Sequence, residues 1–162
     1  MISEKMAQRL NDQINLEFFS SYTYLSMAAY FKTQGLNGFA HWMLHQADEE
    51  RAHGMKFFEY LYDQDRSAVL QAIKQPHTTF ASALAVFEET LSHEKHVTAS
   101  IVELMSLALE EKDHATRILL DWFINEQVEE EAAARDIRDR LKLVKDNAMG
   151  ILLIDRELAA RT

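Results

Sequence analysis

The 162-residue chain has no cysteine, so it can form no disulfide, thiolate zinc site or iron–sulfur cluster. Any metal must therefore be bound by oxygen and imidazole ligands. The chain also has only four glycines and one proline, too few for the many tight turns of a β-sandwich or β-barrel. Because 48% of the residues are hydrophobic, the chain can bury one sizeable core. We expect a single all-α domain over residues 1–162, built from long helices.

Long apolar runs and an excess of basic residues are also missing. No run approaches the roughly 20 apolar residues that a membrane span requires, and the first residues do not read as a secretory signal. We expect a cytoplasmic protein that does not bind membranes. With 17 basic and 26 acidic residues, the net charge is −9, which argues against a nucleic-acid partner and is compatible with a cationic ligand.

The apolar spacing predicts four long helices and a short fifth one, over residues 3–33, 38–64, 82–109, 114–142 and 150–160. Ser3, Asn37 and Asp113 are predicted to cap the first, second and fourth helices. Short turns make the first two helices one antiparallel hairpin and the next two another. The 17-residue link at 65–81 can span roughly 55 Å, more than the length of a helix. The sequence therefore predicts a four-helix bundle with one long crossover.

Polar residues interrupt the core-facing seam of all four long helices. The seam of such a bundle alternates steps of three and four residues, and following that rule meets an acidic or polar residue near the middle of each helix. Because each lies near the midpoint of its helix, these residues are expected to lie at one level of the bundle, whichever way the helices run. They are Glu17, Glu50, the adjacent His53, Glu94, Gln127 and Glu130.

The two predicted hairpins also read as diverged copies of one unit. Four pairs of polar positions are each separated by 77 residues, and so are the turns around Gly35 and Lys112. The pairs are Glu17 with Glu94, Glu49 with Glu126, Glu50 with Gln127, and His53 with Glu130. An internal repeat of this kind predicts a site to which both hairpins contribute.

A buried cluster of carboxylates repels itself and normally takes up protons, unless a cation lies among the side chains. Two divalent ions, one bridged to the other by Glu50, would remove this repulsion. Oxygen ligands with one imidazole suit iron(II), manganese(II) or zinc(II). The Glu50-x-x-His53 spacing places both side chains on one helix face, although this motif alone is not specific.

Several neighbouring residues have two open interpretations. Tyr24 lies seven residues from Glu17 on the same face and is either a hydrogen-bonded core residue or a neighbour of the site. Glu49, Glu126 and Glu129 form either an accessory metal site or a solvated helix face, and Glu131 is expected to be solvated. The six remaining histidines have no convergent partners and are expected to be surface or hydrogen-bonded residues: His41, His45, His77, His93, His96 and His114.

Over essentially its whole length the chain resembles a bacterial non-haem ferritin. The resemblance implies a cage of 24 identical subunits that oxidises Fe(II) to Fe(III) with O₂ at a di-iron ferroxidase centre and stores the ferric mineral inside. The stretches that carry it are Asn15-Leu16-Glu17 with Tyr24, residues 48–53, His93-Glu94, residues 125–130 and residues 153–158.

By position, the resemblance implies that Glu17, Glu50 and His53 bind one iron and that Glu50, Glu94 and Glu130 bind the second. Gln127 would lie near both ions and Tyr24 beside the first. Glu49, Glu126 and Glu129 would help to form a third iron position.

Two departures from related families bear on the prediction. The bacterioferritins have a second Glu-x-x-His and a haem-binding Met, where this chain has Gln127-x-x-Glu130 and Arg51, so no haem is expected.

The alternative function is that of a rubrerythrin-like di-iron oxidase or peroxidase without storage. The absence of a Cys-x-x-Cys electron-transfer module argues against it. A metal-free structural bundle would have no reason to bury the acidic cluster.

Overall fold

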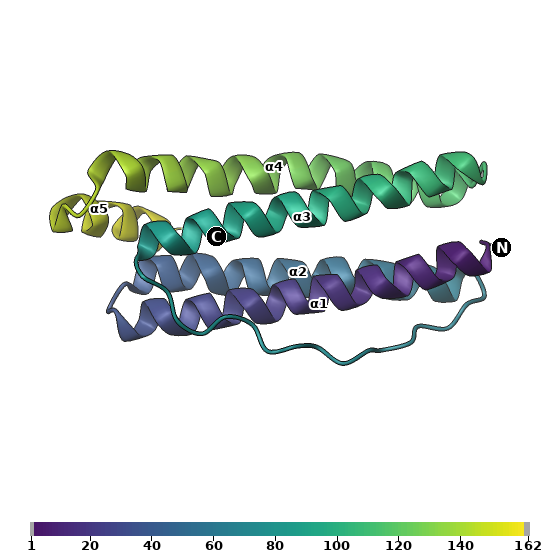
Figure 1. Ribbon diagram of the computed structural model, residues 1–162, viewed down its shortest axis with the longest axis horizontal. Coiled ribbons are helices and arrows are strands. Elements are labelled where there is room, and N and C mark those ends of the chain that lie inside the picture. The colour runs from purple at the N-terminus through teal and green to yellow at the C-terminus, as the bar shows by residue number, and fades with distance from the viewer. Residues whose placement is uncertain (1, 161–162) are drawn as a thin grey trace.

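The computed structural model describes residues 2–160, which contain five α-helices and no strand (Figure 1). They are α1 (Glu4–Thr33), α2 (Asn37–Asp63), α3 (Ala83–Glu110), α4 (His114–Val144) and α5 (Ala148–Leu158). The predicted helices, including the short fifth one, are therefore confirmed to within a few residues at each end. None of these helices is long and apolar enough to cross a membrane.

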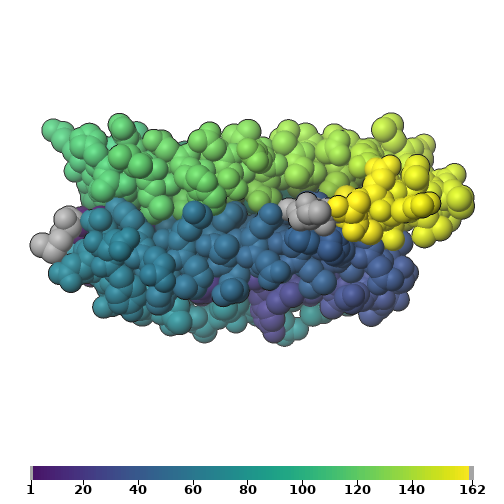
Figure 2. Space-filling view, turned by 180° about the vertical axis from the view of Figure 1, so that it is seen from behind, coloured from purple at the N-terminus to yellow at the C-terminus, as the bar shows by residue number. Residues whose placement is uncertain are grey.

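Two antiparallel hairpins, α1–α2 and α3–α4, lie side by side and form the bundle (Figure 1). The link from α2 to α3 runs back along the length of α1, so that α2 and α3 point the same way (Figure 1). From the opposite side, α4 lies along α2, and α5 covers one end of the bundle (Figure 2). The predicted bundle with one long crossover is thus confirmed.

The turns of the two hairpins support the internal repeat. Gly35 closes α1 with a φ of +72°, and Lys112, 77 residues later, closes α3 with a φ of +55°. Left-handed backbone at this position commonly ends a helix, and glycine adopts it without the strain that a Cβ brings. The two hairpins therefore reverse direction in the same way, although only one of them uses glycine.

Two of the three predicted helix caps are present, and one prediction is wrong. The side chains of Ser3 and Asp113 accept hydrogen bonds from backbone N–H groups in the first turns of α1 and α4. Asn37, in contrast, is the first residue of α2, and the N-cap residue Leu36 provides no side-chain bond. The N–H of Phe39 instead donates to Oδ1 of Asp155 in α5, at 2.9 Å. The cap of α2 therefore comes from a residue 116 positions away, which local sequence does not reveal.

The apolar core is divided into two clusters, one at each end of the bundle. In one cluster Phe31 and Phe39 stack with ring centroids 4.9 Å apart, and in the other Phe57 and Phe123 stack at 4.0 Å. Burying each such side chain contributes about 1.5–3 kcal/mol to stability. The ends of the bundle thus hold the four helices together, and the middle is left for polar side chains.

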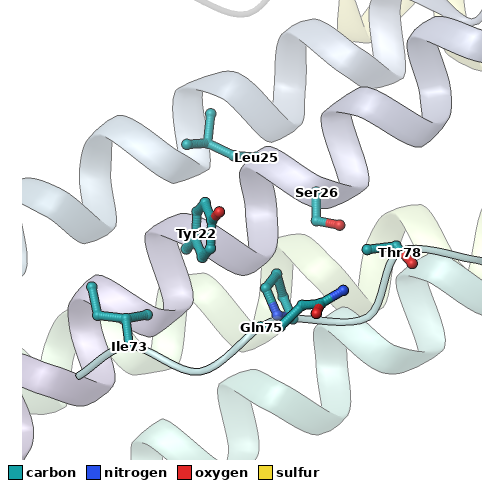
Figure 3. Close-up of a pocket in the computed structure, with 7 residues that line it drawn as sticks. Tyr22, Leu25, Ser26, Ile73, Gln75 and Thr78 are labelled. Atoms are coloured by element: carbon teal, nitrogen blue, oxygen red, sulfur yellow. The ribbon is translucent and has the colours of Figure 1, made fainter.

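The crossover is fixed to α1 by asparagine side chains. The Oδ1 of Asn11 accepts a hydrogen bond from the N–H of Val69 at 2.6 Å, and Nδ2 of Asn15 donates to the carbonyl of Ala72 at 3.2 Å. Further along, Tyr22, Leu25 and Ser26 of α1 line a surface pocket together with Ile73, Gln75 and Thr78 of the crossover (Figure 3).

Candidate metal centre

The structure brings together the six polar side chains predicted for the middle of the bundle. Each lies midway along its helix, flanked by apolar seam residues whose packing also buries the polar one. The exposed fractions are 1% for Glu17, Glu50 and Glu94, 2% for Gln127, 5% for His53 and 9% for Glu130. All four long helices therefore contribute to one buried cluster.

The half of the cluster on α1 and α2 consists of Glu17, Glu50 and His53. Ligand atoms of the three side chains lie within 4.8 Å of one another, and Nδ1 of His53 is 3.4 Å from Oε2 of Glu50. Gln13 donates a hydrogen bond to Oε1 of Glu17 at 2.8 Å. The other oxygen of Glu17 and both oxygens of Glu50 are buried without a hydrogen-bond partner. Such orphaned oxygens are rare in proteins, and Glu17 and Glu50 each bring at least one oxygen into the same group as the His53 ring.

The half on α3 and α4 differs because its carboxylates are hydrogen-bonded. Glu94 accepts a short hydrogen bond from the hydroxyl of Tyr24 and another from Nε2 of Gln127 at 3.1 Å. Oε2 of Glu130 accepts from Nε2 of Gln46 at 2.7 Å. Tyr24, which is fully buried, is therefore a neighbour of the cluster, and its hydroxyl orients Glu94.

Burial controls the protonation of the cluster. It is the main cause that raises the pKa of Glu17, Glu50 and Glu94. The charge of Glu50 raises the pKa of Glu17 further, and the charge of Glu94 does the same to Glu50. Burial also raises the pKa of Glu130 to about 7. The pKa of Tyr24 is raised well above its ordinary value, first by burial and then by the charge of Glu94, so the phenol stays protonated as a donor.

The accessory carboxylates are less tightly gathered. Glu126 is half-buried, and one of its oxygens lies within 4.8 Å of ligand atoms of both His53 and Glu130. Glu49 is half-buried, and its charge raises the pKa of Glu130 after the larger effects of burial and Glu94. Glu129 is exposed on α4. The structure therefore places Glu126 beside the cluster and Glu49 near Glu130, whereas Glu129 faces solvent.

Supporting residues around the cluster were not predicted from the sequence. Gln13 and Gln46 lie four residues before Glu17 and Glu50, and Thr98 lies four residues after Glu94. Thr98 accepts a hydrogen bond from Gln127 at 3.3 Å and donates to Glu131 at 2.7 Å, so Glu131 is bonded inside the bundle and is not simply solvated. A polar residue one helical turn from each of the three glutamates is the signal that would have identified these side chains.

The chemistry of the cluster fits a hard or borderline divalent cation. Three partnerless oxygens, further carboxylates and one imidazole match the ligands that iron(II), manganese(II) and zinc(II) prefer. A cation would also remove the repulsion among carboxylates that burial otherwise keeps protonated. Glu94 and Glu130 are held by hydrogen bonds from neighbouring side chains, as carboxylates that bind metal ions in proteins usually are.

Comparison with known proteins agrees with this geometry. Residues 7–144 match the family model described as a ferritin-like domain. The bacterial non-heme ferritin of Staphylococcus epidermidis is 40% identical over 162 residues, covering 100% of this chain and 98% of that protein, and one from Staphylococcus aureus is 38% identical over the same length.

Among solved structures, an open pore ferritin from the archaeon Archaeoglobus fulgidus superposes with a TM-score of 0.99 at 45% identity, covering 100% of both chains. A closed form of the A. fulgidus ferritin, engineered by site-directed mutagenesis, gives 0.98 at 46% identity and covers 100% of this chain and 99% of that one. The fold, the match to the family model and the similarity to these relatives over its full length show that the chain belongs to the ferritin family.

Proposed function

We propose that the protein is an iron-storage ferritin with ferroxidase activity, which oxidises Fe(II) with O₂ inside each subunit and stores the Fe(III) mineral. The observation that carries the proposal is that Glu17 and Glu50, with three partnerless carboxylate oxygens between them, are grouped with His53 in the buried interior. An enclosed set of this composition destabilises the metal-free bundle and is useful only for binding cations.

In this proposal each half of the cluster holds one iron ion. Glu17, Glu50 and His53 bind the first, and Glu50, Glu94 and Glu130 bind the second, with Gln127 beside them. Iron(II) supplies the electrons, one from each ion, that reduce O₂. The hydroxyl of Tyr24 and the amides of Gln13 and Gln46 hold the carboxylates in place, and the surrounding apolar side chains limit the access of water.

A third iron position is proposed beside the pair, with Glu49, Glu126 and Glu129 as ligands. The half-buried positions of Glu49 and Glu126 near Glu130 support it. The exposed Glu129 would have to turn inward to contribute. Because it lies nearer to solvent, this position would hold iron more weakly than the buried pair.

The chain is further proposed to assemble with itself into a cage of 24 subunits in the cytoplasm, the reducing compartment in which iron is available as iron(II). An exposed apolar surface on α1 and the crossover supports self-association: Tyr22 is 50%, Leu25 43% and Ile73 43% exposed around the pocket of Figure 3. Apolar patches of this kind commonly mark protein interfaces.

One experiment tests storage and oxidation together. The purified protein is loaded with iron(II) in air while oxygen uptake is recorded, and is then separated by size. We expect oxygen consumption, followed by elution of the iron with a very large, hollow particle. Oxygen consumption by a monomer or dimer that retains no mineral would favour the rubrerythrin-like alternative. No oxygen consumption above that of iron(II) in buffer would refute the proposed activity.

A further inference from the structure

A second group of metal-binding side chains lies on α2, outside the buried cluster. The rings of His41 and His45 meet edge to face, with centroids 4.5 Å apart and an interplanar angle of 73°. The sequence pattern predicted no convergent partner for either residue, and this prediction is wrong. Residues four apart lie on the same face of a helix, which explains why the two rings meet.

Both imidazoles are partly exposed to solvent, whereas the neighbouring Trp42 and Met43 are buried. The pair therefore lies at the surface of α2, where an ion can reach it without opening the core. Within residues 2–160, no carboxylate or further imidazole joins the pair in a three-residue ligand group. Because the pair lies at the surface, an ion held here would exchange more readily than an ion enclosed by the buried cluster.

We infer that His41 and His45 form a separate surface site for a divalent transition-metal ion. Two histidines at i and i+4 on one helix face present their ring nitrogens to a single ion, as they do in helical zinc sites. Imidazole is a good ligand for copper(II), nickel(II), zinc(II) and iron(II) but a poor one for magnesium or calcium. The site is therefore selective for borderline metals.

The position of the pair indicates a role for such an ion, and this role rests on the proposed function. Glu49, one helical turn after His45, is one of the carboxylates proposed for the third iron position. An ion bound by the two imidazoles thus lies one step along α2 from the accessory carboxylates. The pair would serve as a transient surface binding site from which iron(II) passes towards the interior of the subunit.

Copper(II) provides a spectroscopic test, because its electron paramagnetic resonance signal reports how many imidazole nitrogens bind it. The buried cluster contains a single imidazole, that of His53, and therefore cannot give a signal from two. We expect the assembled protein with one equivalent of copper(II) per subunit to show coupling to two imidazole nitrogens. The variants His41→Gln and His45→Gln should each show coupling to one or none.

His96→Gln is the matched control, because His93 and His96 are the other closely spaced histidines. It should keep the two-nitrogen signal, and helicity measured by circular dichroism should be unchanged in all three variants. A two-nitrogen signal that survives His45→Gln, or a parent protein that binds copper(II) through fewer than two imidazoles, would overturn the inference. Neither result depends on iron oxidation, so the test can fail while the proposed function stands.

Discussion

The two hairpins occupy equivalent positions in the bundle, yet they present their polar residues differently. On the α1–α2 side, one oxygen of Glu17 and both oxygens of Glu50 have no hydrogen-bond partner. On the α3–α4 side, Glu94 and Glu130 accept hydrogen bonds from Tyr24, Gln127 and Gln46.

Divergence at two repeated positions contributes to the difference. Where the first hairpin has Glu50 and His53, the second has Gln127 and Glu130. An amide donates a hydrogen bond where an ionised carboxylate can only accept one, so Gln127 donates to Glu94, whereas no amide or hydroxyl of the described residues donates to Glu50. In the proposed centre, the carboxylates of the second half already accept hydrogen bonds that an incoming ion would weaken, whereas the first half has carboxylate oxygens without such bonds. The two metal positions should consequently differ in affinity.

The largest effect is expected from Glu50→Ala, because Glu50 is the proposed ligand common to both ions. Iron(II) oxidation by the assembled protein should slow about a hundredfold or more, since ligands are at least as critical as the groups that orient them. The measurement is oxygen uptake after addition of iron(II), with His53→Ala as a second variant. Glu59→Ala, which removes an exposed carboxylate from the same helix, is the control and should oxidise iron at the parent rate.

The comparison between the two halves would fail if both bound metal ions with equal affinity. We expect anaerobic titration with zinc(II) to show two binding steps per subunit that differ about tenfold in affinity, because each broken hydrogen bond costs about 1 kcal/mol. Glu17→Ala should remove the tighter step and Glu130→Ala the weaker one. Two identical steps, or loss of the tighter step in Glu130→Ala, would show that the hydrogen bonds do not set the order.

Gln127→Glu would sharpen the comparison by making the second hairpin more like the first. The change removes the amide donor to Glu94 and adds a buried carboxylate, so the second ion should bind about tenfold more tightly while the metal-free protein becomes less stable. Calorimetric titration and thermal unfolding measure the two effects. Asn125→Asp adds a carboxylate to the exposed face of the same helix and should change neither.

The last prediction concerns pH. The pKa of Glu130 is about 7 in the folded protein, against an ordinary value of 4.5, so the folded state binds the proton more tightly than the unfolded state does. The resulting stability is fully present below about pH 4.5 and is lost as the pH rises through 7, by roughly 3 kcal/mol per subunit.

The melting temperature of the metal-free protein should therefore fall by a few degrees between pH 5.5 and 8.5. Glu130→Gln, which cannot titrate, should flatten part of this decrease. Bound zinc(II) should raise the melting temperature more at pH 8.5 than at pH 5.5, because the ion stabilises the charged carboxylates. A variant curve parallel to that of the parent protein would show that Glu130 does not titrate in this range.

Much of the fold follows from the helical period in the sequence. The seam predicted for the fourth helix, from Leu120 to Leu141 in steps of three and four, is buried at every position, including Gln127 and Glu130. The prediction succeeds because a long helix in a bundle buries one continuous stripe of side chains. The same period was sufficient to place the polar residues of all four helices at one level.

The asymmetry between the two halves could not be predicted in this way. It depends on contacts between helices, such as Gln46 of α2 with Glu130 of α4, and on which atoms of a side chain donate. The cap that Asp155 gives to α2 and the meeting of the His41 and His45 rings are likewise not determined by the period alone. Side-chain rotamers and distant contacts decide such features.

The most direct test of the central claim, that the buried carboxylates exist to hold iron, is a crystal of the protein soaked anaerobically in iron(II) and measured at the iron absorption edge. We expect two anomalous peaks inside each subunit, one between Glu17, Glu50 and His53 and a weaker one between Glu50, Glu94 and Glu130. An interior without iron, with these side chains still protonated or turned away, would contradict the account.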